Sequence, residues 1–177
     1  LSETWGAEPN GGFVQVRLAN DAQNLATAVA QPTAARASWF LDAQGEGLKT
    51  VHYVFLDAAG NAGSAGQATI TYDATTPLVT ATRTTPSPTA SPVVGLSLTT
   101  VETSPFSPDA GLAVAESPLF TNAQVGPYVA TTTYTLGAGD GARSVFVRVR
   151  DAAGNEGTAS VSLELDTTAP TGLAVAV

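Results

Sequence analysis

Apolar and polar residues alternate along several short segments of this 177-residue chain, which is the pattern of β-strands with one buried face. Turn-forming Gly, Pro, Asn and Asp residues bound these segments, which are 13–18, 49–56, 67–72, 93–99, 130–136, 143–150 and 159–165. No segment keeps a helical period with caps, and Pro32 interrupts the Ala-rich stretch 25–37. The pattern therefore predicts an all-β protein.

Two motifs occur twice in the same order. Asp-Ala-Ala-Gly-Asn stands at 57–61 and 151–155, and the two copies lie 94 residues apart. Each is followed by an alternating strand and then Asp-x-Thr-x-Pro, at 73–77 and 166–170, whose prolines lie 93 residues apart. A period of about 93 residues is the size of one immunoglobulin-like sandwich. We therefore predict one domain over 1–77, a second over 78–170, and a separate segment 171–177.

The alternation in the second copy indicates which face of the strand 143–150 is buried. Its even positions include two arginines, so the face formed by Val145, Val147 and Val149 is predicted to point into the core.

The same correspondence makes a prediction for the first copy. The residues that match the valines point inward, and Val54 and Leu56 are left facing outward. That apolar pair is either an ordinary surface feature or a contact patch. Upstream, Trp39 aligns with Tyr134 and is predicted to lie in the core.

With these motifs assembled, the chain resembles the bacterial immunoglobulin-like repeat domains found in tandem in large surface and secreted proteins. The likeness is carried by Gly-Asp-Gly-Ala-Arg (139–143), the run that follows it, and the two repeated motifs; it is weak over 5–35. The resemblance implies two tandem immunoglobulin-like (fibronectin III-like) β-sandwich domains. Such modules usually serve as spacers or adhesive stalks, and some bind calcium near domain junctions.

Composition excludes several functions. The chain has no Cys and a single His, so a thiolate metal site, a disulfide framework and a His-based triad are not expected. Seven Lys and Arg against 15 Asp and Glu give a net charge of −8, which argues against a nucleic-acid partner. No apolar run reaches the ~18 residues that a membrane span needs. Ser and Thr are abundant but have no base beside them, so we expect no catalytic residues and no enzyme activity.

Calcium is the one candidate cofactor, and the protein is not expected to require it. The oxygen ligands that Ca²⁺ prefers come from two predicted clusters, which are Asp57, Asn61 and Asp73 in the first copy and Asp151, Asn155 and Asp166 in the second. The competing interpretation is a tight turn, in which the Asp side chain bonds the backbone amides and Gly supplies a positive φ. The turn explains the whole pentapeptide without a ligand.

Two further segments have simple structural interpretations. Gly-Ala-Gly-Asp-Gly at 137–141 lies between two strands and is predicted to be a hairpin rather than a phosphate cradle. The Pro-rich stretch within 78–92 is predicted to open the second domain as an irregular segment at a sheet edge.

The two ends of the chain are out of phase with the repeat. Glu3 and Thr4 align with Glu102 and Thr103, so the first domain lacks the opening strands of the second. The apolar run 171–177 starts where a third repeat would start. One explanation is a window from a longer repeat array, which the Leu at position 1 also suggests. The other is strand complementation, in which Leu173, Val175 and Val177 of one subunit fill the open domain of the next.

These observations favour a structural module of an extracellular or cell-surface bacterial protein: a stalk, an adhesin segment or a filament subunit. The expected partners are neighbouring repeats or identical subunits. The alternative is a ligand-binding accessory module of a secreted enzyme, in which an aromatic such as Trp5 contacts a carbohydrate or another surface ligand.

Overall fold

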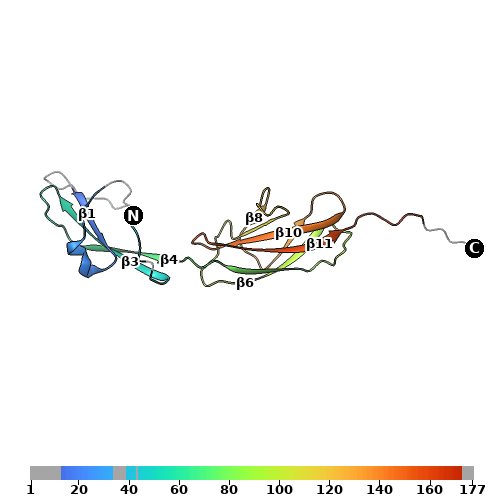
Figure 1. Ribbon diagram of the computed structural model, residues 1–177, viewed down its shortest axis with the longest axis horizontal. Coiled ribbons are helices and arrows are strands. Elements are labelled where there is room, and N and C mark those ends of the chain that lie inside the picture. The colour runs from blue at the N-terminus through green and yellow to red at the C-terminus, as the bar shows by residue number, and fades with distance from the viewer. Residues whose placement is uncertain (1–12, 34–38, 43, 173–177) are drawn as a thin grey trace, which may run out of the picture. The chain divides into compact units, whose positions relative to one another are not determined.

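The computed structural model describes residues 13–33, 39–42 and 44–172 (Figure 1). The chain divides into two compact units, unit 1 (1–73) and unit 2 (74–177), with the boundary a few residues before Pro77. Almost all of the regular structure is antiparallel strand, which confirms the predicted all-β class. Each unit is described by itself below.

Unit 2 is a two-sheet β-sandwich. The first sheet has the order β11-β10-β7-β8 and the second the order β5-β6-β9, and all neighbouring strands are antiparallel. The bounds of the strands are β5 Leu78–Arg83, β6 Val93–Val101, β7 Leu112–Ala115, β8 Gln124–Gly126, β9 Thr131–Thr135, β10 Gly141–Arg150 and β11 Glu156–Leu165.

The core of unit 2 lies between its two sheets. The valines at 145, 147 and 149 are 0% exposed, which confirms the face predicted from the two arginines opposite them. Leu96 and Leu98 of β6 meet them from the second sheet, in one cluster of buried apolar residues. The cluster is buried because β6, β10 and β11 alternate apolar and polar residues, so that each sheet turns its apolar face toward the other.

The chain enters unit 2 by crossing β11 at a glycine. Pro77 is fully buried, and a Cβ added to Gly157 would lie 1.8 Å from the carbonyl oxygen of Pro77. Only a residue without a side chain therefore allows this backbone approach. The chain then forms β5 at the edge of the second sheet. The edge position was predicted for 78–92, but residues 78–83 form a regular strand rather than an irregular segment.

Unit 1 has one sheet in its described residues, with the order β2-β1-β3-β4. The bounds are β1 Phe13–Ala19, β2 Gln31–Pro32, β3 Gly47–Asp57 and β4 Gly66–Tyr72, with the short 3₁₀ helix η1 at Ala22–Thr27. Asp21 caps η1 by accepting a hydrogen bond from the amide of Gln23 at 2.7 Å. The sheet repeats the order of the first sheet of unit 2, with β4, β3, β1 and β2 in the places of β11, β10, β7 and β8.

The face prediction for β3 was wrong at two residues. Val54 and Leu56 are 7% and 3% exposed, so they do not form an outward patch. For Val54 the cause is η1, which places Leu25 against this face, where Leu25 forms a small cluster with Ala19 and Val54. The matching face in unit 2 carries Arg148 instead, which points to solvent and Glu156. The apolar pair Val54 and Leu56 therefore indicates that this face of the sheet in unit 1 is covered by other residues.

The opposite face of β3 is only partly covered. Val51, Tyr53 and Phe55, which match the buried valines of unit 2, are half-buried. The rings of Tyr53 and Phe55 meet edge to face with centroids 5.4 Å apart. Trp39, predicted to be in the core, is half-buried as well.

Residues 137–141 do not form a hairpin. The strands on either side of them, β9 and β10, belong to different sheets of unit 2 and do not pair. The glycines at 139 and 141 have φ of 102° and 115°, so they carry the chain across from one sheet to the other. Alternation identified both strands correctly but could not identify the sheet to which each belongs.

Candidate functional site

The Asp-Ala-Ala-Gly-Asn motif forms the same closed turn in both units. In unit 1, Asp57 Oδ1 accepts hydrogen bonds from the amides of Ala59 and Asn61, both at 2.8 Å, and Oδ2 accepts one from Asn61 Nδ2 at 2.8 Å. Gly60 has a φ of 85°, as the turn requires. The Asn61 side chain is the main cause of a lowered pKa of the Asp57 carboxyl.

In unit 2 the Asp of this turn is buried. Asp151 Oδ1 accepts hydrogen bonds from the amides of Gly154 and Asn155 at 2.7 and 2.9 Å, and Oδ2 accepts one from Asn155 Nδ2 at 2.9 Å. Asp151 is 1% exposed. Burial by itself would raise the pKa of this carboxyl, but the hydrogen bonds from Asn155 and Gly154 outweigh it and lower the pKa. Both oxygens are thus occupied within the turn.

The structure does not assemble the predicted calcium clusters. Tyr72 pairs with Gly47, so Asp73 lies at the opposite end of β3 from Asp57, about 33 Å away at about 3.3 Å per residue. The pairing of Leu165 with Gly141 likewise separates Asp166 from Asp151 by the length of β10. Within the described residues, no group of three or more His, Cys, Asp or Glu side chains is placed to hold a metal ion. In each predicted cluster the first Asp and the Asn lie together, but the second Asp lies at the far end of the hairpin.

A different carboxylate holds the chain where it leaves unit 2. Asp140 Oδ1 accepts hydrogen bonds from the amide and Oγ1 of Thr167 at 2.9 and 2.7 Å, and Oδ2 accepts one from Thr168 Oγ1 at 2.6 Å. These bonds, the Thr167 hydroxyl first, lower the pKa of Asp140 to about 2. Sequence reasoning missed this residue, although Gly-Asp-Gly at 139–141 has a counterpart in Gly-Glu-Gly at 45–47.

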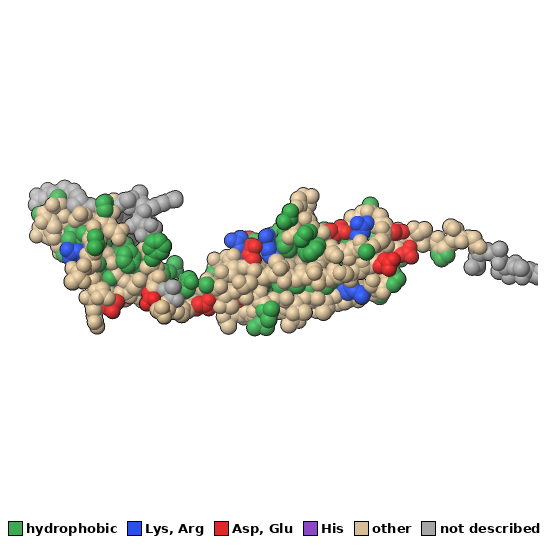
Figure 2. All heavy atoms as spheres, in the orientation of Figure 1, with side chains coloured by type: hydrophobic (Ala, Val, Ile, Leu, Met, Phe, Trp, Pro, Cys, Tyr) green, Lys and Arg blue, Asp and Glu red, His purple; other side chains and the backbone are tan. Residues whose placement is uncertain are grey.

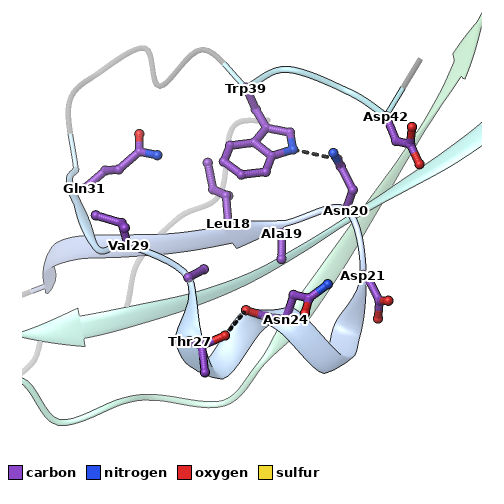
Figure 3. A pocket seen from close by; sticks show the side chains of 11 residues that line it. Leu18, Ala19, Asn20, Asp21, Asn24, Thr27, Val29, Gln31, Trp39 and Asp42 are labelled. Atoms are coloured by element: carbon purple, nitrogen blue, oxygen red, sulfur yellow. Dashed lines mark hydrogen bonds between the residues drawn. The ribbon is translucent and has the colours of Figure 1, made fainter. Parts of the chain in front are cut away.

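A groove in the described residues of unit 1 has a volume of about 670 Å³. It lies between β1, η1 and the segment that carries Trp39 (Figure 3). Its lining includes Leu18, Asn24, Val29, Gln31, Trp39 and Asp42. The indole and the side chains of η1 lie on opposite sides of the groove in this view. Groove volumes of about 300–1,000 Å³ are usual for small-molecule sites.

The remaining predicted site residues are not among the residues that the structure describes. Leu173, Val175 and Val177, the candidate donor-strand residues, and Trp5, the candidate binding aromatic, are beyond the described residues.

On the face shown in Figure 2, acidic side chains lie scattered over both units and basic ones are few. No helix in the described ranges is long and apolar enough to cross a membrane.

Comparisons with known proteins leave the family open. No protein-family model matches the chain, and no curated protein matches it. The two-sheet sandwich of unit 2 stands on its own geometry, and the immunoglobulin-like identity stays a prediction.

Proposed function

We propose that the chain is a non-catalytic structural module of an extracellular or cell-surface bacterial protein, in which tandem immunoglobulin-like domains act as a stalk, an adhesin segment or a filament subunit. The course of the chain through unit 2 carries this proposal. It enters beside Gly157, near one end of β11, and leaves after Leu165 at the other, about 26 Å away at about 3.3 Å per residue (Figure 1). Copies joined through such ends extend instead of folding back.

Both ends of unit 2 are also anchored. On entry, Pro77 is buried against β11, and on exit Asp140 holds Thr167 and Thr168 through three hydrogen bonds. A linker whose residues bond to the domain transmits orientation better than a Gly/Ser chain of the same length. This anchoring supports a spacer role over a flexible tether.

The interior of unit 2 supports a role without catalysis. Among the described residues, Asp151 is the buried charged side chain, and the turn occupies both of its oxygens. Catalytic groups are usually buried or partly buried groups poised to exchange protons with a ligand. Asp151 instead accepts bonds from its own turn.

The test is the length of the particle. A second copy of residues 74–170 is inserted after Pro170, and the maximum dimension is measured by small-angle X-ray scattering. We expect the dimension to grow by about the length of unit 2, and by the same amount again for a third copy. A dimension that stays constant would contradict the spacer role.

The filament form of this proposal relies on the sheet of unit 1. Its half-buried face, with Val51, Tyr53 and Phe55, matches the face that the second sheet covers in unit 2. We propose that residues 171–177 of a second copy pair with unit 1 as a donor strand. Deletion of 171–177 should then abolish head-to-tail oligomers in sedimentation velocity. Oligomers that persist in this variant would refute complementation and leave the spacer role standing.

A further inference from the structure

The groove of unit 1 carries an inference that does not depend on the structural role. Its described lining combines one aromatic side chain, two amides without a hydrogen-bond partner and two carboxylates around a volume of about 670 Å³. By contrast, the second hollow, in unit 2 beside Phe120 and Phe146, has about half this volume and is lined by hydroxyl and apolar groups. The groove beside Trp39 is therefore the better candidate for a ligand.

The aromatic wall of the groove is held in place. Trp39 Nε1 donates a hydrogen bond to Asn20 Oδ1 at 2.7 Å, and Asn20 Nδ2 donates one to the carbonyl of Phe40 at 3.1 Å. The indole is thus fixed by its polar edge, and it is half-buried, so part of it remains open (Figure 3). A ring fixed before a ligand arrives loses little conformational entropy on binding.

The polar groups around the groove both donate and accept. Among the described residues, the side-chain amides of Asn24 and Gln31 have no hydrogen-bond partner, and each offers two donors and an acceptor. Asp42 uses Oδ1 to accept from the amide of Gln44 at 3.0 Å, which leaves Oδ2 for another donor. A ligand that suits this set must itself donate and accept at several neighbouring positions.

The charge of the groove restricts the ligand further. Among the described residues that line it, the charged ones are Asp21 and Asp42, and the whole chain carries a net charge of −8. Phosphates, sulfates and acidic sugars would be repelled. A quaternary ammonium ligand would suit a cage of several rings, but Trp39 is the one aromatic residue in the described lining.

We propose that this groove binds a neutral saccharide. The apolar face of one sugar ring packs on the indole of Trp39, and its hydroxyls, which both donate and accept, bond to Asn24, Gln31 and Asp42. Such a groove would let a structural module hold on to a glycan surface. The site is shallow, so affinity in the millimolar range is expected for a single short oligosaccharide.

The experiment is a titration of the full chain followed by the indole N–H signal of Trp39 in ¹⁵N-edited NMR, with Trp5→Phe used to assign the two indoles. The probes are cellotriose, maltotriose and tri-N-acetylchitotriose, with trigalacturonate and choline as charged comparisons. At least one neutral trisaccharide should give a saturable shift, and the two charged probes should give none.

Variants locate the binding to the groove. Asn24→Ala and Gln31→Ala should each raise Kd about fivefold, the factor that corresponds to one net hydrogen bond of about 1 kcal/mol. Gln67→Ala removes an exposed amide from β4, outside the groove, and should leave Kd unchanged. Trp39→Ala should abolish binding, read from backbone amides of η1. Thermal melting checks that each variant is folded.

Three results would overturn the proposal. The first is no shift with any neutral trisaccharide. The second is a response to choline or trigalacturonate at least as strong as the response to the neutral sugars. The third is a Kd that Asn24→Ala and Gln31→Ala leave unchanged. If the groove instead accepts a segment of a second copy, Trp39→Ala would dissolve a concentration-dependent oligomer, and no saccharide would move the indole signal.

Discussion

Each unit contains a four-stranded sheet with the same strand order, but the two sheets are covered to different extents. In unit 2 the sheet β11-β10-β7-β8 is covered by β5-β6-β9, and the residues between the sheets are almost fully buried. In unit 1 the matching sheet β4-β3-β1-β2 has η1 on one face and half-buried aromatics on the other. The repeated motif therefore specifies a hairpin and its turn, but the core depends on what lies against it.

The largest expected difference between the units is in their cores. Leu96→Ala should destabilise unit 2 by about 2–5 kcal/mol, because the side chain is 1% exposed within a large cluster. Leu25→Ala should cost unit 1 much less, because Leu25 has only a small buried cluster around it. Urea unfolding followed by amide signals from each unit measures both. Equal losses in the two units would contradict the comparison.

The next difference is at the glycine that follows each turn. Gly157→Ala should destabilise unit 2 by about 1–3 kcal/mol, because the new Cβ would meet the backbone of Pro77. Its counterpart 94 residues earlier, Gly63, is exposed, and Gly63→Ala is the matched control. We expect little change in the control. A tolerated Gly157→Ala in thermal melting would mean that the entering chain is not anchored at β11.

The turn itself should matter more where it is buried. Asp151→Ala removes the acceptor of three hydrogen bonds at a buried site and should destabilise unit 2 by about 1–2 kcal/mol. Asp57→Ala also removes the acceptor of three hydrogen bonds, but Asp57 is only half-buried, so the effect on unit 1 should be smaller. Denaturant midpoints of the two units provide the test. A larger loss from Asp57→Ala would reverse the comparison.

The hydrogen bonds that hold Thr167 and Thr168 to Asp140 at the end of unit 2 should weaken at acidic pH. The pKa of Asp140 is lowered from 3.8 to about 2, so its contribution is complete above pH 3.8 and is lost as the pH falls toward 2. Hydrogen exchange of the Thr167 amide, expressed relative to its intrinsic rate at the same pH, should therefore become faster as the pH falls through this window in the native protein. In Asp140→Asn it should already be faster at neutral pH, without a step in the window. An identical pH profile in the variant would show that Asp140 does not hold the exit.

The smallest expected effect is that of calcium. Because both oxygens of Asp57 and of Asp151 accept bonds within their turns, chelation should leave the melting temperature of each unit unchanged. Scanning calorimetry with EDTA and with added calcium measures this. A rise in melting temperature with calcium in one unit would show a metal site there.

The sequence predicted strands better than it predicted their partners. Each strand proposed from alternation is present, because period two is a local property of residues on a pleated surface. The strands β2, β5, β7 and β8 were missed. All four residues of β7 are buried, which removes the alternation, and β2 and β8 have only two and three residues. Residues 78–83, which form β5, were assigned to an irregular segment. The Asp–Asn pairs could be recognised for the same local reason, since the whole turn lies within five residues.

Contacts between distant residues could not be predicted in this way. Asp73 and Asp166 were assigned to metal clusters by motif, but strand register places them at the far ends of their hairpins. Val54 and Leu56 were assigned to the surface by analogy with Arg148 and Arg150, but both are buried, Val54 against Leu25 of η1. The groove beside Trp39 depends on three segments of unit 1 that local patterns do not connect.

By itself, the sequence determined the all-β class, the duplicated hairpin with its Asp–Asn turn, and the buried valine face of β10, because each follows from spacing within one strand or one turn. The tertiary structure decided which sheets are covered, where carboxylates meet hydroxyls, and where a groove opens. Those outcomes depend on strand register and on packing between segments far apart in the chain. The free energy that burial contributes there depends on neighbouring residues that a local sequence pattern does not identify.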